Sequence, residues 1–175
     1  MLSDRRRVLG PDHDDAIESL HVLAMASARI EEPAEAVRVY RELLDVLVGR
    51  LGDEHDEVLD VATTAGRLLV SAGAPERAVA LHTHVRDVRS RVKGDADPET
   101  LDAWDDLAIA LREAGRPGDS CDAYESFLPM MAEALGEDHD SYQYSLAGYA
   151  NALRLAGRTT EADAVDARLA EAEGD

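Results

Sequence analysis

Cysteine, lysine and aromatic residues are all scarce in this 175-residue chain. Cys121 is the only cysteine, so no disulfide can form within the chain, and a reducing, cytoplasmic location is expected. No apolar run approaches the roughly 20 residues that a membrane-spanning helix needs. The basic start of the chain is not followed by an apolar stretch, which argues against a secretory signal. These absences exclude a disulfide-stapled secreted domain and a membrane-spanning protein.

The shortage of aromatic residues and of basic charge narrows the fold and the partner. Aromatic residues make up 4% of the chain although 45% of its residues are apolar. The core must then consist mainly of Ala, Leu and Val, which suits closely packed helices better than a thick β-sandwich. The 18 Lys and Arg residues face 37 Asp and Glu residues, which gives a formal net charge of −19. Such a charge repels nucleic acid and anionic membranes and attracts a basic protein or peptide.

A repeat of 42 residues organises the chain. Its clearest mark is a glycine followed by an acidic loop, at Gly10, Gly52, Gly94 and Gly136. A second glycine falls halfway through three of the units, at Gly73, Gly115 and Gly157. We therefore predict one domain over residues 9–175, with repeats at 9–50, 51–92, 93–134 and 135–175. Residues 1–8 match the end of a preceding repeat's second helix, so the chain is expected to be part of a larger bacterial protein.

Each unit predicts two helices. The first has a buried face with spacings of three, one and three residues, which is one face of an α-helix. In the first unit this face is Leu20, Leu23, Ala24 and Ser27, and the later sets are Ala62, Ala65, Gly66 and Leu69; Trp104, Leu107, Ala108 and Leu111; Leu146, Tyr149, Ala150 and Leu153. The second helix is predicted to begin near Pro33, Pro75, Pro117 and Thr159. Short linkers make each pair an antiparallel hairpin, and hairpins must stack to bury their apolar faces. The predicted fold is all-α, an α-solenoid of four helix-turn-helix repeats.

These units resemble the 42-residue tetratricopeptide repeats (TPRs) of kinesin light chains. The Leu-Gly-Pro-Asp-His-Pro-Asp loop of that family corresponds here to Leu9-Gly10-Pro11-Asp12-His13-Asp14-Asp15, and its Gly-Arg turn to Gly115-Arg116 and Gly157-Arg158. The resemblance covers residues 9–175 and implies a right-handed superhelix that binds proteins or peptides. The family's first helix usually carries an Asn pair that holds peptide backbone. Those positions read His21-Val22, Thr63-Thr64, Asp105-Asp106 and Ala147-Gly148, so the amide clamp is absent here.

Histidines in the acidic loops are of a type that could bind a metal ion. His13, His55 and His139 each stand among carboxylates just before a predicted helix. Because this pattern recurs at the repeat period, we interpret it as helix capping. The sequence has no Gly-x-Ser-x-Gly nucleophile turn and no Gly-x-x-x-x-Gly-Lys phosphate loop. We therefore predict no enzyme activity, no metal and no cofactor.

The concave wall formed by the first helices is the candidate peptide-binding groove. Its predicted residues are Asp60, Thr64, Arg67, Asp102, Asp105, Asp106, Ile109, Arg112, Tyr144, Asn151 and Arg154. They place a row of acids beside a row of arginines, so a partner's basic side chains would lie over the acids. The arginines could hold a carboxylate through two hydrogen bonds. The same residues could instead form a solvated helix face with internal ion pairs.

The sequence thus predicts a cytoplasmic scaffold that binds a protein or peptide, with basic character favoured and nucleic acid and membranes excluded. Two alternatives remain open. One is a self-association module that stacks through the end faces of the repeats. The other is the sensor arm of a larger ATPase-type signalling regulator.

Overall fold

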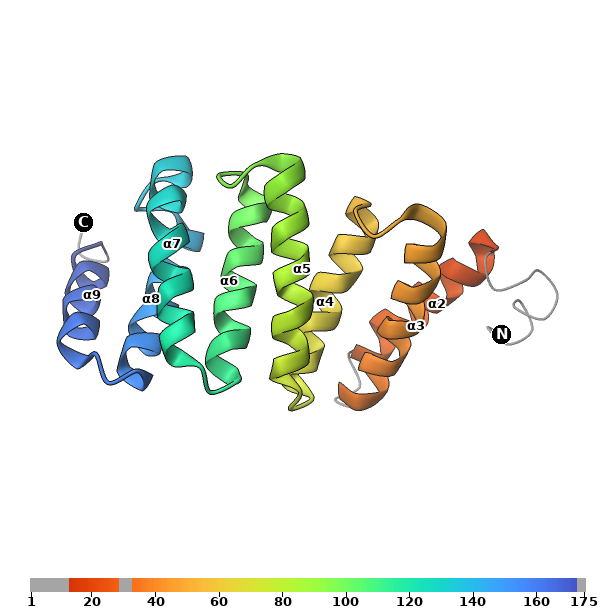
Figure 1. Cartoon of the computed structure of the whole chain (residues 1–175), viewed down its shortest axis with the longest axis horizontal. Coiled ribbons are helices and arrows are strands. Elements are labelled where there is room, and N and C mark those ends of the chain that lie inside the picture. Colours follow the sequence, from red (N-terminus) through yellow and green to blue (C-terminus); the bar gives the residue numbers. More distant parts are fainter. Residues whose placement is uncertain (1–12, 29–32, 173–175) are drawn as a thin grey trace. The chain divides into compact units, whose positions relative to one another are not determined.

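The computed structural model describes residues 13–28 and 33–172, and within them all regular structure is α-helical. The eight helices of this part are α2 (Asp14–Ala28), α3 (Pro33–Leu51), α4 (Asp56–Ser71), α5 (Pro75–Lys93), α6 (Pro98–Glu113), α7 (Pro117–Leu135), α8 (Asp140–Leu155) and α9 (Thr159–Ala172). They follow one another along the chain as successive helix pairs (Figure 1). The prediction of an all-helical repeat fold is confirmed. The predicted helix remnant at residues 1–8 lies outside the described residues.

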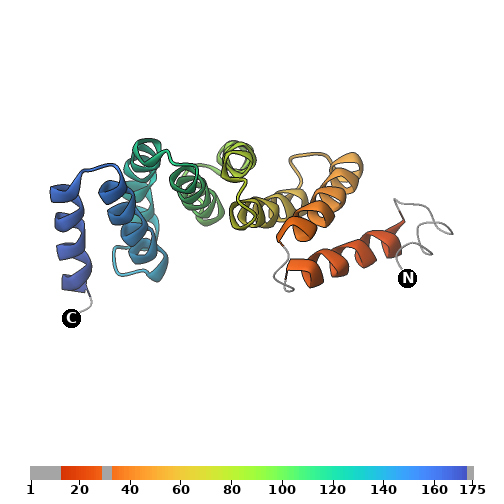
Figure 2. The same ribbon diagram turned by 90° about the horizontal axis from the view of Figure 1, so that it is seen from below.

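Two compact units make up the chain, Met1–Leu81 and His82–Asp175, and their boundary falls inside α5. In the first unit α3 packs against both α2 and α4. In the second unit α7 packs against α6 and α8, and α8 packs in turn against α9. Both views show α9, coloured dark blue, beside α8 (Figures 1 and 2). Within each unit these helices therefore cover a sequence neighbour, as repeat stacking requires.

The histidines of the acidic loops cap the helices that follow them. The Nδ1 atom of His55 accepts a hydrogen bond from the backbone N–H of Glu57 at 3.2 Å, and His139 does the same with Ser141 at 3.2 Å. In the third repeat Asp97 takes this place, and its side chain accepts a hydrogen bond from the backbone N–H of Glu99 at 3.0 Å. The interpretation of these loops as caps is confirmed, with the imidazole as the acceptor in place of a carboxylate.

The repeat glycines mark helix ends at which the backbone needs a positive φ. Gly136 closes α7 with φ of 92°, and Gly157 follows α8 with φ of 78°. L-residues with a Cβ rarely adopt this conformation, so glycine is the residue that lets the chain turn here. The second helices begin where predicted, at Pro33, Pro75, Pro117 and Thr159.

The core of the first unit consists of aliphatic side chains on α2, α3 and α4. Leu20 and Leu43 are at its centre, 1% and 0% exposed. Leu23 does not join them, because its side chain is 41% exposed. The prediction that Leu23 is buried was therefore wrong. Ala65 and Leu107, at the same position in the next two repeats, are each 5% exposed, and Tyr149 in the fourth repeat is half-buried.

The core of the second unit contains most of the chain's aromatic rings. Trp104 on α6 stacks on Phe127 of α7 with ring centres 6.3 Å apart, and Tyr124 lies 5.5 Å from Phe127. The guanidinium of Arg86, on the C-terminal half of α5, lies 4.2 Å above the Trp104 ring. Tyr124 also contacts Tyr149 of α8 at 5.8 Å, so one aromatic cluster joins α6, α7 and α8. No helix among the described residues is long and apolar enough to cross a bilayer.

Candidate functional site

Eight of the eleven predicted groove residues lie on α6 and α8 in the second unit. Asp102, Asn151 and Tyr144 are exposed, and the Tyr144 side chain is 66% exposed. Asp105, Ile109 and Arg112 are half-buried. Asp106 was expected to face outward, but it is buried, with only 7% of its surface exposed. We call the exposed and half-buried members the α6–α8 face: Asp102, Asp105, Ile109, Arg112, Tyr144, Asn151 and Arg154.

Asp105 joins the two helices of this face. The hydroxyl of Ser145 on α8 donates a hydrogen bond to the Asp105 carboxylate at 2.8 Å. Burial raises the pKa of Asp105 to about 6, although the Ser145 hydrogen bond acts to lower it. The negative charges of Asp106 and Asp102 raise this pKa further, and Arg112 lowers it. The face thus holds one carboxyl group that is costly to ionise and sensitive to its surroundings.

Tyr124 packs directly under this face. Its ring is fully buried between α7 and α8, and its hydroxyl lies against Gly148. A Cβ at position 148 would overlap the Tyr124 hydroxyl oxygen, closer than real Cβ contacts allow. Glycine at this position therefore lets α8 approach α7. Burial raises the pKa of Tyr124, and the nearby Asp105 charge adds to this effect.

The arginines of the α6–α8 face are held by acids of the same chain. Arg112 pairs with its neighbour Glu113 at 3.0 Å, and Arg154 pairs with Asp166 of α9. Arg112 and Arg154, the two guanidinium groups of the predicted row that lie on this face, are thus engaged in ion pairs. Asp166 occupies the position that Tyr124 holds one repeat earlier, so this pair replaces an aromatic contact with a polar one.

The other three predicted residues lie on α4 of the first unit. Asp60 and Arg67 are exposed, and Thr64 is half-buried. The Thr64 hydroxyl donates to the backbone carbonyl of Asp60 at 3.1 Å. We therefore describe these three as a separate surface of the first unit.

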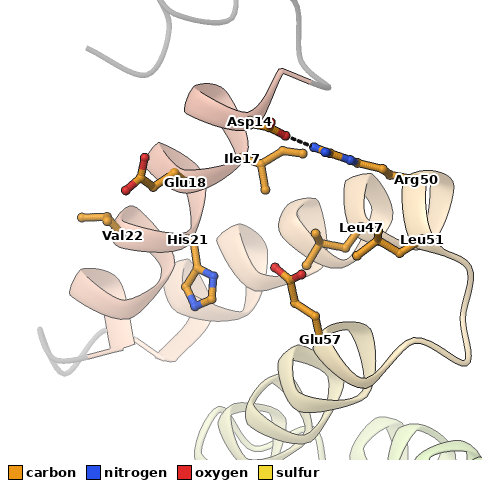
Figure 3. Close-up of a pocket in the computed structure, with 9 residues that line it drawn as sticks. All are labelled: Asp14, Ile17, Glu18, His21, Val22, Leu47, Arg50, Leu51 and Glu57. Atoms are coloured by element: carbon orange, nitrogen blue, oxygen red, sulfur yellow. Dashed lines mark ion pairs between the residues drawn. The ribbon is translucent and has the colours of Figure 1, made fainter.

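A pocket that the sequence analysis did not predict lies between α2, α3 and the start of α4 (Figure 3). Its volume is about 360 Å³. The residues that line it are Asp14, Ile17, Glu18, His21, Val22, Leu47, Arg50, Leu51 and Glu57. We call it the α2–α4 pocket. One signal was present in the sequence, because His21 and Val22 replace the Asn pair of the family that these repeats resemble. The aliphatic residues from α3 could be placed only once the helices were packed.

Possible metal ligands do not gather into a site in the part of the chain that the structure describes. Residues 13–28 and 33–172 contain no group of three or more His, Cys, Asp or Glu side chains placed to hold a metal ion. The loop histidines use Nδ1 as a helix cap, as at His55 and His139.

Together the helix pairs and their packing define a TPR-like repeat fold of the kinesin light chain-like kind. The nearly identical TPR-like repeats of a kinesin light chain candidate from Podosopora anserina superpose with a TM-score of 0.87 at 22% identity, over 98% of this chain and 82% of that chain. A point variant of those repeats gives a TM-score of 0.88 at 22% identity, over 98% and 81% of the two chains.

A further solved structure, BtubC (BKLC) from P. vanneervenii, has a TM-score of 0.80 at 14% identity. That match covers 91% of this chain and 63% of the other. No family model matches the sequence, and no curated protein matches it either. The likeness is therefore one of fold.

Proposed function

We propose that this chain is a non-catalytic scaffold that binds a protein or peptide of basic character on its α6–α8 face. We assign its four repeats to residues 9–50, 51–92, 93–134 and 135–175. The helix pairs α2–α3, α4–α5, α6–α7 and α8–α9 each correspond to one of them. The observation that carries the proposal is an exposed aromatic ring, Tyr144, on the same face as acidic side chains and on a repeat fold that generally binds proteins.

The chemistry of this face favours a basic partner. Tyr144 offers a rigid, exposed ring, which is the kind of side chain that concentrates binding energy at interfaces. Asp102 is exposed on the neighbouring helix, and the chain as a whole carries a net charge of −19. Because Arg112 and Arg154 are paired with acids of this chain, the acids of the face set its character. A partner's lysine or arginine is attracted to such a surface and also packs on an aromatic ring.

The test is a titration of the full chain against fluorescein-labelled peptides of graded Lys and Arg content, followed by fluorescence anisotropy. Tyr144→Ala should weaken binding of the best peptide about tenfold, and Asp102→Asn should weaken it less. Asp163→Asn removes the same charge from an exposed position on α9, which is not a member of the α6–α8 face, and should leave binding unchanged. Added salt should weaken binding because exposed charges are screened. Equal affinity in all three variants would refute the proposal.

Self-association is a second candidate, because one end of the first unit exposes apolar side chains. Leu23, Val22 and Met25 on α2 are 41%, 62% and 55% exposed. The residues that correspond to Leu23 in the next two repeats, Ala65 and Leu107, are buried. The exposed face of α2 is therefore of the type that another helix covers.

Light scattering coupled to size exclusion, run over a wide concentration range, tests this second function. A mass that rises with concentration and returns to that of the monomer in Leu23→Ser would support it. Val92→Ser removes an exposed apolar side chain from α5 and serves as the control. A monomer at every concentration would exclude self-association and leave the α6–α8 face as the functional surface.

A further inference from the structure

The α2–α4 pocket combines an aliphatic wall with acidic side chains at its edge. Leu47 and Ile17 are 2% and 8% exposed, and Leu51 of α3 is half-buried beside them. Glu18 comes from α2 and Glu57 from the first turn of α4, so the two carboxylates stand on different helices (Figure 3). The volume of about 360 Å³ falls in the range of pockets that hold a single side chain or small ligand.

The charges of the pocket are unequally balanced. Arg50 is the only Lys or Arg among the lining residues, and it forms an ion pair with Asp14, drawn as a dashed line in Figure 3. Glu18 and Glu57 have no side-chain hydrogen bond or ion pair with any other residue in the described ranges. Both side chains are exposed, so their charges are available to a molecule that enters the pocket. Among the described residues, the pocket therefore presents two carboxylates that have no paired cation, next to an aliphatic surface.

We propose that this pocket binds the arginine side chain of a partner protein, with the methylene stem on Ile17, Leu47 and Leu51 and the guanidinium between Glu18 and Glu57. This inference rests on the proposed scaffold function and adds a specific anchor to it. It also places the anchor in the first unit, on residues different from those of the α6–α8 face.

Arginine fits the pocket better than the other side chains of similar size. An acidic side chain is repelled by Glu18 and Glu57, and an uncharged aliphatic one would crowd these carboxylates without compensating their lost hydration. A long basic side chain lays its stem on apolar surface and keeps its charge at the edge. Guanidinium is more weakly hydrated than ammonium and offers donors in a planar fork, so it suits two carboxylates from two helices.

The experiment uses capped single amino acids as probes, so it needs no identified partner. The ¹⁵N-labelled full chain is titrated with N-acetyl-arginine-methylamide and, separately, with N-acetyl-norleucine-methylamide, which has a similar stem and no charge. The arginine probe should shift the amide signals of Ile17, Glu18 and Glu57 in a saturable way, with a dissociation constant on the order of millimolar. The norleucine probe should bind at least about fivefold more weakly, because it lacks the charge.

Charge variants locate the binding. Glu57→Gln keeps the shape of the side chain and should weaken the arginine probe about fivefold, and Glu18→Gln should do the same. Asp45→Asn removes an equal charge from a position of α3 that does not line the pocket, so the affinity should stay the same. Amide spectra of the variants without probe show that the first unit is still folded.

Three results would overturn the inference. The norleucine probe could bind as well as the arginine probe, the shifts could fall outside the pocket, or Glu57→Gln and Asp45→Asn could have equal effects. A cationic peptide that binds through Tyr144 while these pocket variants change nothing would overturn the arginine anchor and leave the scaffold function standing. A pocket that takes the arginine probe while no peptide senses Tyr144 would overturn the α6–α8 face instead.

Discussion

Replacing Asp105 by asparagine should stabilise the fold at neutral pH, and the gain should vanish in acid. The Asp105 carboxyl is half-buried between α6 and α8, and burial with two neighbouring acids raises its pKa to about 6 from 3.8. The folded state therefore favours the protonated form. The contribution of Asp105 to wild-type stability should therefore be largest below about pH 4 and should be lost as the pH rises through 6.

The size of the effect follows from the pKa shift. A difference of about two pKa units corresponds to about 3 kcal/mol of unfolding free energy. Asparagine has nearly the same shape, does not ionise, and offers a carbonyl oxygen to the hydroxyl of Ser145. The stability of Asp105→Asn relative to the wild type should therefore grow by about 2–3 kcal/mol between about pH 4 and pH 7.5.

Urea unfolding of both proteins at several pH values, followed by circular dichroism, measures this difference directly. Asp163→Asn on α9 changes an exposed carboxylate and should show a small difference from the wild type at every pH. A constant difference for Asp105→Asn across the pH range would refute the argument. So would a variant that is less stable than the wild type at neutral pH, because Ser145 and Arg112 would then stabilise the ionised form more than burial opposes it.

Three further predictions test the packing of the two units. Gly148→Ala should lower the free energy of unfolding by about 1–3 kcal/mol, because its Cβ would meet the Tyr124 hydroxyl. Tyr124→Phe in the same chain should recover part of this loss, measured by thermal unfolding. A Gly148→Ala variant as stable as the wild type would show that α8 approaches α7 less closely. Ser145→Ala should raise the pKa of Asp105, measured by NMR titration, because it removes the hydrogen bond that lowers it, and a fall would contradict this cause. Leu43→Ala should lower the free energy of unfolding by about 2–5 kcal/mol. Hydrogen exchange should show lost amide protection first in residues before 82, and an equal loss of protection in both units would contradict their separate cores.

Much of the fold could be predicted because its signals are local and repeated. The proline that opens a second helix and the glycine that closes it act on the backbone of their own turn, as Pro117 and Gly136 do for α7. The acidic loops were interpreted as caps because a cap needs only an acceptor next to the helix start, as at His139. Repetition turned each of these weak signals into a strong one.

The candidate site was harder to predict because exposure depends on which helix lies alongside. Asp106 was expected to face outward with Asp105, but the packing of the second unit buries it. Arg154 was expected to be available to a partner, but α9 brings Asp166 to it. Periodicity shows which residues share a helix face and does not show what the next helix places over that face.

By itself the sequence determined the helices, their ends, the repeat length and the acidic character of the surface, because these depend on neighbouring residues and on composition. Only the tertiary structure decided which polar groups meet. It brought Ser145 to Asp105 across 40 positions of sequence and Tyr124 against Gly148. It also assembled the α2–α4 pocket from three helices. Contacts of this kind depend on the distance and rotation between packed helices, which the pattern along one helix does not record.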